Sequence, residues 1–345
     1  MYTNYVKNFD YSTFKSIRNK MENVDNPIYW RGTIYIGTQP LYIECGVEWL
    51  AKKIDTYFVK AIENQHIENS KELYILEAGI SDFIYQPDWF TTNVYFLGDD
   101  LSKKPDLIVH NNCVFLKENN VSFISITNED EINFYHLGEN HLLMRLLNYI
   151  FDDESNIILH GAVVGYDNYG ILITGLSGAG KSTLSAYCLK NGMQFVGDDR
   201  IAISKQGDSV VANPIYTTIS LIKPISGLKT TTKYATKTGI KDIFILDKSQ
   251  FSTNIPICAI IEPEKCELDT PQILQAQKSP ILTRICMDYS YYSLLTRSTN
   301  PLVEYRMISD LLCNAKSFKL KLSTSIDKNA NALFELTKHK GVLDV

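Results

Sequence analysis

One glycine-rich stretch constrains the fold of this chain more than any other feature of its sequence. Residues 175–182 read G-L-S-G-A-G-K-S, which matches the phosphate-binding P-loop pattern G-x-x-x-x-G-K-[ST]. Residues 170–174 before it form an apolar run typical of a buried strand, and residues 182–190 after it carry apolar side chains at helical spacing. A strand, a glycine loop and a helix in this order predict a nucleotide-phosphate site.

The residue types in this stretch suit the binding of an anion. Glycines allow successive backbone N–H groups to turn towards one phosphate, and the N-terminus of the following helix adds a partial positive charge. In this motif Lys181 reaches the β- and γ-phosphates, and the hydroxyl of Ser182 binds Mg²⁺. The predicted nucleotide-binding residues are Gly175, Ser177, Gly178, Ala179, Gly180, Lys181, Ser182 and Thr183.

An acidic pair, Asp198 and Asp199, follows the short run 194–197. It lies about one helix and one turn beyond Lys181, where a Walker-B-type carboxylate belongs. One carboxylate is needed near Mg²⁺, and a transferase also benefits from a base on the acceptor hydroxyl. Because adjacent strand residues point to opposite faces, the two carboxylates share a site only if the strand has ended there or if one acts through water. The alternative interpretation of the pair is a solvated turn.

The composition restricts the class of protein. The chain has 345 residues, of which 45% are hydrophobic and 21% charged, which is ordinary for a soluble globular protein of two domains. A net charge of −5 without a long basic run argues against nucleic-acid and membrane partners. The seven cysteines form no C-x-x-C pair, which fits a reducing compartment. Without a secretion signal or an apolar run long enough to span a membrane, we expect a cytoplasmic enzyme.

The chain is expected to have two parts. Residues 1–135 contain no chemical motif, and their pattern predicts an N-terminal α+β domain with a hairpin at 29–42 and an amphipathic helix over 47–67. Substrate recognition is our hypothesis for this part. Residues 136–345 are the predicted catalytic domain, which begins with a helix at 141–151.

Strand-like segments are concentrated around the P-loop. Residues 156–164 predict one strand, and the turn at 165–170 returns the chain antiparallel into the P-loop strand. Because the usual P-loop strand belongs to a parallel βαβ unit, this hairpin predicts a mixed sheet. Residues 223–242 are rich in Lys, Thr and Gly and predict a loop, whereas residues 280–292 and 330–340 predict helices.

Residues 159–203 resemble the catalytic domain of HPr serine kinase and its relatives. The resemblance rests on L-H-G at residues 159–161, on the strand that runs into the P-loop, and on G-D-D-R-I-A-I at residues 197–203. It implies an α/β (α+β) fold like that of phosphoenolpyruvate carboxykinase, with the P-loop in a mixed sheet. Residues 1–135 match no motif of this family.

The resemblance implies a kinase that uses ATP and Mg²⁺ to phosphorylate a serine hydroxyl on a peptide or small protein. Lys181 and the loop amides would hold the phosphates. Ser182 would bind Mg²⁺ with one of Asp198 and Asp199, and the other Asp would be the base. His160 would lie beside the transferring phosphoryl group. Relatives of this kinase often self-assemble, which raises a homo-oligomer as a further expectation.

The sequence departs from HPr kinase/phosphorylase in one signature. The E-x-R-G motif of that enzyme is absent from this chain, and E-Y-R-M at residues 304–307 matches it only in part. The chain looks more like stand-alone relatives that phosphorylate a precursor peptide in natural-product pathways. Arg200, Arg284 and Arg297 are candidates for countering phosphate charge, with salt bridges or surface positions as the alternative for the last two. Two other functions stay open, namely a kinase of a small molecule such as free serine and a nucleotide-binding sensor or scaffold.

Overall fold

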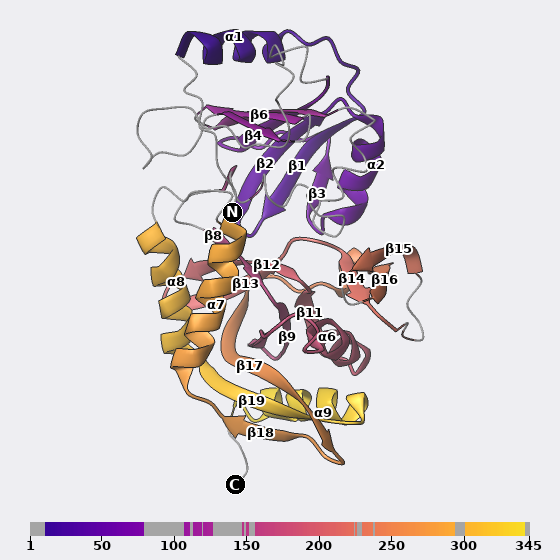
Figure 1. Cartoon of the computed structure of the whole chain (residues 1–345), viewed down its shortest axis with the longest axis vertical. Coiled ribbons are helices and arrows are strands. Elements are labelled where there is room, and N and C mark those ends of the chain that lie inside the picture. The colour runs from indigo at the N-terminus through magenta and orange to yellow at the C-terminus, as the bar shows by residue number, and fades with distance from the viewer. Residues whose placement is uncertain are drawn as a thin grey trace. The chain divides into compact units, whose positions relative to one another are not determined.

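The structure is a computed structural model of the chain, which divides into two compact units. The first comprises Met1–Tyr35, Gln39–Asp152 and Ser293–Thr299, and the second comprises Ile36–Thr38, Asp153–Tyr292 and Asn300–Val345. Figure 1 shows the strands and helices of each unit. The described residues are 11–78, 107–110, 113–118, 120–126, 147, 150–151, 156–223, 225, 230–236, 239–293 and 301–341. Most of the helix predicted at 141–151 therefore lies outside them.

The first unit is built on a seven-stranded sheet in the order β3-β1-β2-β4-β7-β6-β5. β2, β4 and β7 are parallel neighbours, whereas β6 pairs antiparallel with β5 and β7. The hairpin predicted at 29–42 is confirmed, since β1 and β2 are neighbours joined by a turn at Gly37 and Thr38. The elements are α1 (Tyr11–Glu22), β1 (Trp30–Ile36), β2 (Gln39–Cys45), α2 (Glu48–Tyr57), β3 (Ala61–Glu63), β4 (Lys71–Glu77), β5 (Leu107–His110), β6 (Cys113–Glu118) and β7 (Val121–Ile126).

The two described helices of this unit pack on its strands. α2 lies against β2 and β3, while α1 places Ile17 and Met21 on a core with Leu116 and Phe123. The helix predicted over 47–67 is shorter than expected, because the chain becomes extended at Phe58 and continues into β3. There its backbone groups bond to β1, so sheet pairing outweighs the helical spacing of the apolar residues.

The second unit is built on a nine-stranded mixed sheet. Its main path runs β11-β9-β10-β17-β13-β12-β8, and β19 and β18 join through β17. β10, the strand before the P-loop, pairs antiparallel with β9 and parallel with β17, so the predicted hairpin and mixed sheet are confirmed. The strands of this sheet are β8 (Asn156–His160), β9 (Ala162–Tyr166), β10 (Tyr169–Ile173), β11 (Gln194–Gly197), β12 (Arg200–Gln206), β13 (Ser209–Pro214), β17 (Ile255–Leu268), β18 (Gln272–Gln275) and β19 (Lys316–Ser323).

Two short links join opposite ends of this strand path. β8 leads into β9 through Gly161, and β11 leads into β12 through Asp198 and Asp199. The links lie together, because the N–H of Gly161 donates to the carbonyl oxygen of Asp199 at 3.2 Å. We call residues 160–161 and 198–200 the strand junction. The single strand predicted over 156–164 is therefore wrong, because the chain changes strand at Gly161, where a Cβ atom would lie 3.0 Å from the carbonyl oxygen of Ile173.

A loop prediction is also wrong in part. Residues 223–242 were expected to be irregular, but the structure has a three-stranded sheet in the order β14-β16-β15 that includes their second half. The run of threonines in β15 explains the difference, since β-branched residues favour strands. The strands are β14 (Thr218–Leu221), β15 (Thr230–Thr236) and β16 (Gly239–Ile245).

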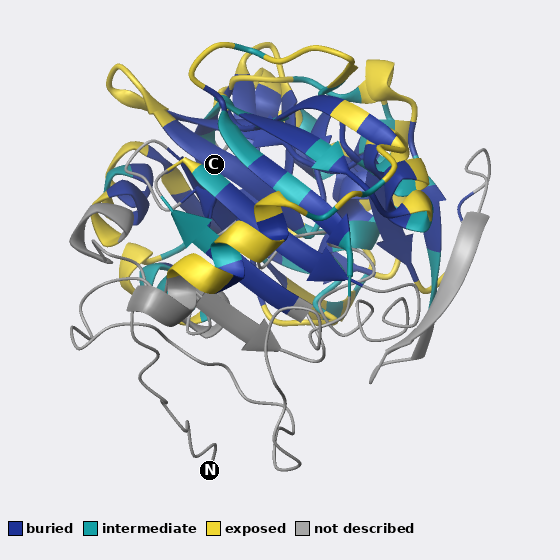
Figure 2. Cartoon of the chain, turned by 90° about the horizontal axis from the view of Figure 1, so that it is seen from above, coloured by how far each residue is buried: buried dark blue, intermediate teal, exposed yellow. Residues whose placement is uncertain are grey.

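Two hydrophobic cores flank the nine-stranded sheet. One gathers apolar side chains of α6, α9, β14 and β16, and the other gathers those of α7 and α8. Figure 2 shows long buried stretches in many of the strands, with exposed residues largely on helices, turns and strand ends. The predicted helices at 280–292 and 330–340 are confirmed. The helices are α6 (Lys181–Lys190), α7 (Lys278–Ser293), α8 (Pro301–Asn314) and α9 (Ile326–Lys338), with a 3₁₀ turn η2 (Lys248–Gln250).

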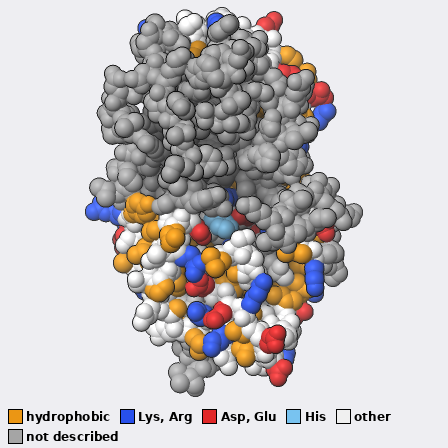
Figure 3. Space-filling view, in the orientation of Figure 1, with side chains coloured by type: hydrophobic (Ala, Val, Ile, Leu, Met, Phe, Trp, Pro, Cys, Tyr) orange, Lys and Arg blue, Asp and Glu red, His pale blue; other side chains and the backbone are white. Residues whose placement is uncertain are grey.

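On the face shown in Figure 3, acidic and basic side chains are interspersed over the described part, without a broad region of one sign. Within the described residues, none of the helices combines the length and the apolar character that crossing a membrane requires.

Candidate active site

The P-loop joins β10 to α6, and all eight predicted nucleotide-binding residues lie in the loop or in the first turn of α6. Gly175, Gly178 and Gly180 have φ angles of +139°, +82° and +97°, which side chains disfavour. No side chain caps the N-terminus of α6, which begins at Lys181. The first N–H groups of the helix are therefore free of an intrahelical partner and of a cap, which is the arrangement of an anion site.

Lys181 lies beneath the loop. Its ammonium group donates to the carbonyl oxygens of Gly175, at 2.7 Å, and of Leu176, at 3.2 Å. Burial lowers the pKa of Lys181, while the charges of Asp199 and Asp198 act in the opposite direction. The cation is thus held at the base of the loop by backbone oxygens, for which phosphate oxygens can substitute.

Asp198 is buried beside the P-loop. Its side chain is 5% exposed, and neither carboxylate oxygen makes a hydrogen bond of acceptable geometry, although the hydroxyl of Ser182 lies near enough to lower its pKa. Burial, followed by the charge of Asp199, raises the pKa of Asp198 to about 7. A buried, unpaired carboxylate next to a hydroxyl is a donor set that suits a hard cation such as Mg²⁺. The described residues include no cluster of three His, Cys, Asp or Glu that would hold a metal without further ligands.

Asp199 differs from Asp198 in exposure and in partners. β11 ends at Gly197, and Asp199 has φ +67°, so the alternation of a strand no longer applies at the pair. Its side chain is 29% exposed. Oδ1 of Asp199 lies 3.2 Å from Nε2 of His160 and 3.7 Å from a guanidinium nitrogen of Arg200. The structure thus brings His160 to the acidic pair and gives the two acids different environments.

A third carboxylate, Asp288 of α7, approaches the same histidine and was not predicted. Its Oδ2 lies 3.7 Å from Nδ1 of His160, so the imidazole lies between Asp288 and Asp199. Burial lowers the pKa of His160, but the hydrogen bonds to the two carboxylates outweigh burial and raise it. The hydrogen bond to His160 in turn lowers the pKa of Asp288. No pattern in the sequence around Asp288 points to this contact, which depends on the packing of α7.

The three arginines that were candidates for countering phosphate charge have different surroundings. Arg200 lies in the strand junction, 4% exposed, and donates to the carbonyl oxygen of Asp199 at 3.1 Å. Arg284 forms an ion pair with Glu262 of β17, with Nε 2.7 Å from Oε1, so the salt-bridge alternative describes it. Arg297 lies outside the described residues.

In comparison with known proteins, the part of the chain that contains this site matches a known family. Residues 154–228 match the family described as HPr Serine kinase C-terminal domain. This segment contains the P-loop, His160, Asp198 and Asp199, whereas Asp288 lies beyond it. The chain is 35% identical over 77 residues to an HPr kinase/phosphorylase of Alkaliphilus metalliredigens, and 38% identical over 87 residues to one of Treponema pallidum.

The shared region is a limited part of each protein. It covers 22% and 25% of this chain, and the chain spans about a quarter of the length of these curated relatives, 25% and 27%. Among solved structures, the HPr(Ser) kinase/phosphatase from Coxiella burnetii aligns with 53% of this chain and 94% of its own, with 16% sequence identity and a TM-score of 0.27.

Proposed function

Through residues 154–228 the chain belongs to an HPr serine kinase-like family, and from this premise we propose that it is an ATP- and Mg²⁺-dependent kinase. It would transfer the γ-phosphate of ATP to a serine hydroxyl of a peptide or small protein. One observation carries the proposal. The P-loop residues Lys181 and Ser182 lie next to the buried carboxylate of Asp198, and the half-buried carboxylate of Asp199 beside it approaches His160.

The P-loop side of the site would hold the nucleotide. The loop amides and the N-terminus of α6 face an anion, and Lys181 exchanges its bonds to the carbonyl oxygens of Gly175 and Leu176 for bonds to phosphate oxygens. The residues that would hold Mg²⁺ are Ser182 and Asp198. When bound there, Mg²⁺ neutralises charge on the phosphates. With the phosphates fixed, positioning and charge neutralisation supply most of the rate enhancement.

Asp199 is our assignment for the base. Asp198 is buried beside Ser182, whereas Asp199 is the acid that a substrate hydroxyl can reach. Oδ1 of Asp199 is oriented by His160, and its other oxygen would accept the proton of the acceptor serine. The hydrogen bonds to Asp199 and to Asp288 raise the pKa of His160, which favours a cationic imidazole beside the proposed base.

The remaining assignments extend this proposal. The mixed sheet around the P-loop supports a fold like that of phosphoenolpyruvate carboxykinase for residues 136–345. Residues 1–135 would recognise the substrate, and a precursor peptide is our preferred acceptor. Six cysteines of the described residues are free thiols, which supports a reducing compartment such as the cytoplasm.

A transfer assay followed by mass spectrometry tests the proposal. Purified protein, ATP and Mg²⁺ are incubated with peptides encoded beside the gene, with HPr and with free serine. We expect a gain of one phosphate on a peptide or protein serine. Lys181→Ala should lower the rate at least 100-fold, whereas Lys190→Ala, an exposed change on the same helix, should leave it unchanged.

Each other outcome points to a different function. Phosphate on free serine would identify a small-molecule kinase. ATP binding without transfer to any acceptor would favour a sensor or scaffold, and equal rates for Lys181→Ala and the wild type would contradict the assigned site.

A further inference from the structure

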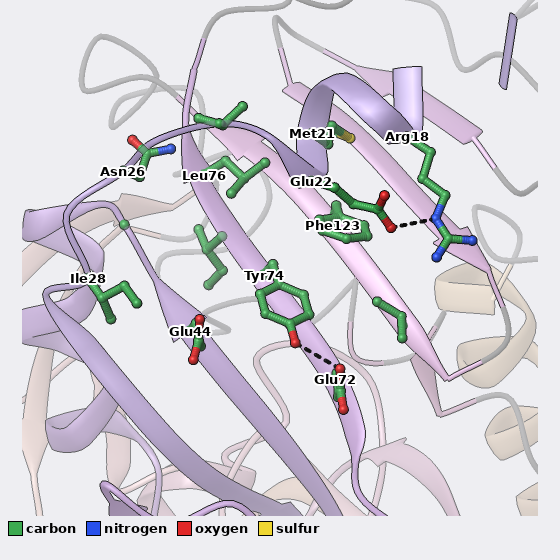
Figure 4. A pocket seen from close by; sticks show the side chains of 14 residues that line it. Arg18, Met21, Glu22, Asn26, Ile28, Glu44, Glu72, Tyr74, Leu76 and Phe123 are labelled. Atoms are coloured by element: carbon green, nitrogen blue, oxygen red, sulfur yellow. Dashed lines mark hydrogen bonds and ion pairs between the residues drawn. The ribbon is translucent and has the colours of Figure 1, made fainter. Parts of the chain in front are cut away.

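The first unit contains a cavity of about 430 Å³ on the face of its sheet that α1 partly covers. α1 packs over Leu116 and Phe123, towards one side of the sheet, and the cavity opens over β2 and β4. Figure 4 shows it lined by the side chains of Glu44, Tyr74 and Leu76. Its volume falls within the range of ligand sites, roughly 300–1,000 Å³.

One half of the cavity is lined by Glu44, Glu72 and Tyr74, and Tyr42 contacts these carboxylates from outside the lining. Glu44 lies opposite Tyr74 in the register of β2 and β4, and Tyr42 lies opposite Glu72. Tyr42 donates to Glu44 at 2.7 Å, and Tyr74 donates to Glu72 at 2.8 Å. Burial raises the pKa of Tyr42 to about 12 and also raises that of Tyr74, so both remain donors at neutral pH. Each carboxylate keeps lone pairs for a further donor.

The other half of the cavity is apolar. Met21 of α1, Leu76 of β4 and Phe123 of β7 line it. Phe123 stacks on Tyr74 with ring centroids 5.2 Å apart, so the aromatic surface continues into the acidic half. Ile28, which is 44% exposed, lies at the rim. An apolar side chain can therefore lie beside a cation within one cavity.

The charges that line the cavity are predominantly negative. Glu22, Glu44 and Glu72 line the cavity together with one arginine, Arg18. The guanidinium group of Arg18 is already paired with Glu22 at 2.9 Å and with Glu118 of β6. The neighbouring His66 approaches Glu72 at 3.4 Å and is 47% exposed. Charge complementarity thus favours a cationic group next to Glu44 and Glu72.

One buried amide indicates that the ligand also has an acceptor. Asn26 lines the cavity, and its Nδ2 is buried without a hydrogen-bond partner. An unsatisfied buried N–H group is costly, so a ligand oxygen that meets it after a rotation of the Asn26 side chain towards the cavity would be favourable. A peptide carbonyl supplies such an oxygen close to side chains, which a simple amine does not.

We propose that this cavity binds a polypeptide segment in which a Lys or Arg stands beside a large apolar residue. The cation lies between Glu44 and Glu72, the apolar side chain lies against Met21 and Leu76, and a backbone carbonyl accepts from Asn26. The segment is part of the polypeptide that the kinase phosphorylates, and only this last clause rests on the proposed function.

Binding is tested with a randomised octapeptide library and the full-length Lys181→Ala variant, which separates binding from transfer. We expect enrichment of peptides with Lys or Arg next to Leu, Ile, Phe or Met. A fluorescein-labelled selected peptide should bind about tenfold more weakly to Glu44→Gln and to Glu72→Gln, which keep an acceptor for the tyrosine hydroxyls. Glu48→Gln, an exposed change on α2, is the matched control and should bind as tightly as the parent.

Four results would overturn the proposal while leaving the kinase assignment intact. One is enrichment of peptides without basic residues. Another is equal affinity of the Glu44→Gln, Glu72→Gln and Glu48→Gln variants with unchanged circular dichroism. The last two are competition by butylamine and competition by a peptide of residues 1–10, each at the concentrations at which the selected peptide binds. Conversely, peptide binding with no phosphate transfer by the wild-type protein would support the cavity as a peptide site and contradict the proposed kinase function.

Discussion

At the scale of single residues, Asp198 is buried in a position that disfavours its own charge. Its carboxylate lacks hydrogen bonds and has a pKa raised to about 7, compared with about 4 in an unfolded chain. Between these two pH values the folded state retains a proton that the unfolded state has released. The stability of the ligand-free protein therefore falls as pH rises from about 4 to 7, and it stays reduced above pH 7.

The variant Asp198→Asn tests this titration. It has no proton to lose, so in chelator and without nucleotide it should gain stability over the wild type as pH rises, by up to about 4 kcal/mol above pH 7. Urea unfolding at pH 5 and pH 8 measures the difference. The same variant should lose Mg²⁺-dependent transfer, and a constant stability difference at both pH values would contradict the burial argument.

Asp288 gives a second prediction at this scale. Since Asp288 and Asp199 together raise the pKa of His160, the change Asp288→Asn should lower that pKa. NMR titration of the imidazole, assigned with His160→Gln, measures it directly. The rate should also begin to fall at a lower pH than in the wild type, because Asp199 loses its imidazolium partner earlier.

The control for this variant is Asp310→Asn, which removes an exposed acid of α8 that pairs with Lys205. It should leave both the titration and the rate profile unchanged. An unaltered His160 titration in Asp288→Asn would remove Asp288 from the site.

Some residues of the candidate site could be predicted from the sequence and one could not, for a physical reason. Lys181, Ser182 and the acidic pair could be predicted because their chemistry depends on local spacing around one loop and one strand end. Asp288 belongs to a helix far along the chain, and its contact with His160 depends on how α7 packs. No local pattern carries that information.

At the scale of elements, the strand junction leaves little room for a side chain at Gly161. A methyl group at position 161 would lie 3.0 Å from both the carbonyl oxygen of Ile173 and a methyl of Leu172. Gly161→Ala should therefore destabilise the protein by about 1–3 kcal/mol, as overpacked cores do. It should also lower the transfer rate, because the neighbouring His160 is displaced from Asp199.

Thermal unfolding and the transfer assay together check this prediction. Ser209→Ala, at an exposed end of β13, is the control and should change stability by less than about 0.5 kcal/mol. A stable and fully active Gly161→Ala protein would show that the junction can shift without affecting the pair.

Elements were predictable where one pattern dominated. The hairpin into the P-loop and the helices α7 and α9 follow from turn residues and apolar spacing. The apolar run 156–164 gave no sign that it divides at Gly161, because both halves are buried and look alike. The short β3 was not predicted, because its apolar residues continue the helical spacing of the preceding segment, which sheet pairing overrides.

At the scale of the whole molecule, the two units should respond differently to nucleotide. A non-hydrolysable ATP analogue with Mg²⁺ at 100 times its Kd would stabilise the unit that binds it by about 2.7 kcal/mol. Hydrogen exchange should slow at residues 175–184, in the P-loop and the start of α6. It should remain unchanged in β2 and β4 of the first unit.

The cavity of the first unit supplies the reciprocal experiment. The selected basic peptide should slow exchange in β2 and β4 and leave the P-loop unaffected. Equal protection of both units by the nucleotide alone would contradict separate sites on separate units.

The strand junction also bears on the order in which the site assembles during folding. β8 ends at His160 and pairs with β12 across a short stretch of sequence, with His160 opposite Arg200. β10, which leads into the P-loop, pairs with β17 across a longer stretch, with Ile171 opposite Ala259. Because closing a longer loop costs more conformational entropy, the pairing of β8 with β12 should form before β17 completes the sheet around the P-loop. The proposed base would then be oriented before the phosphate-binding loop is fixed in the sheet.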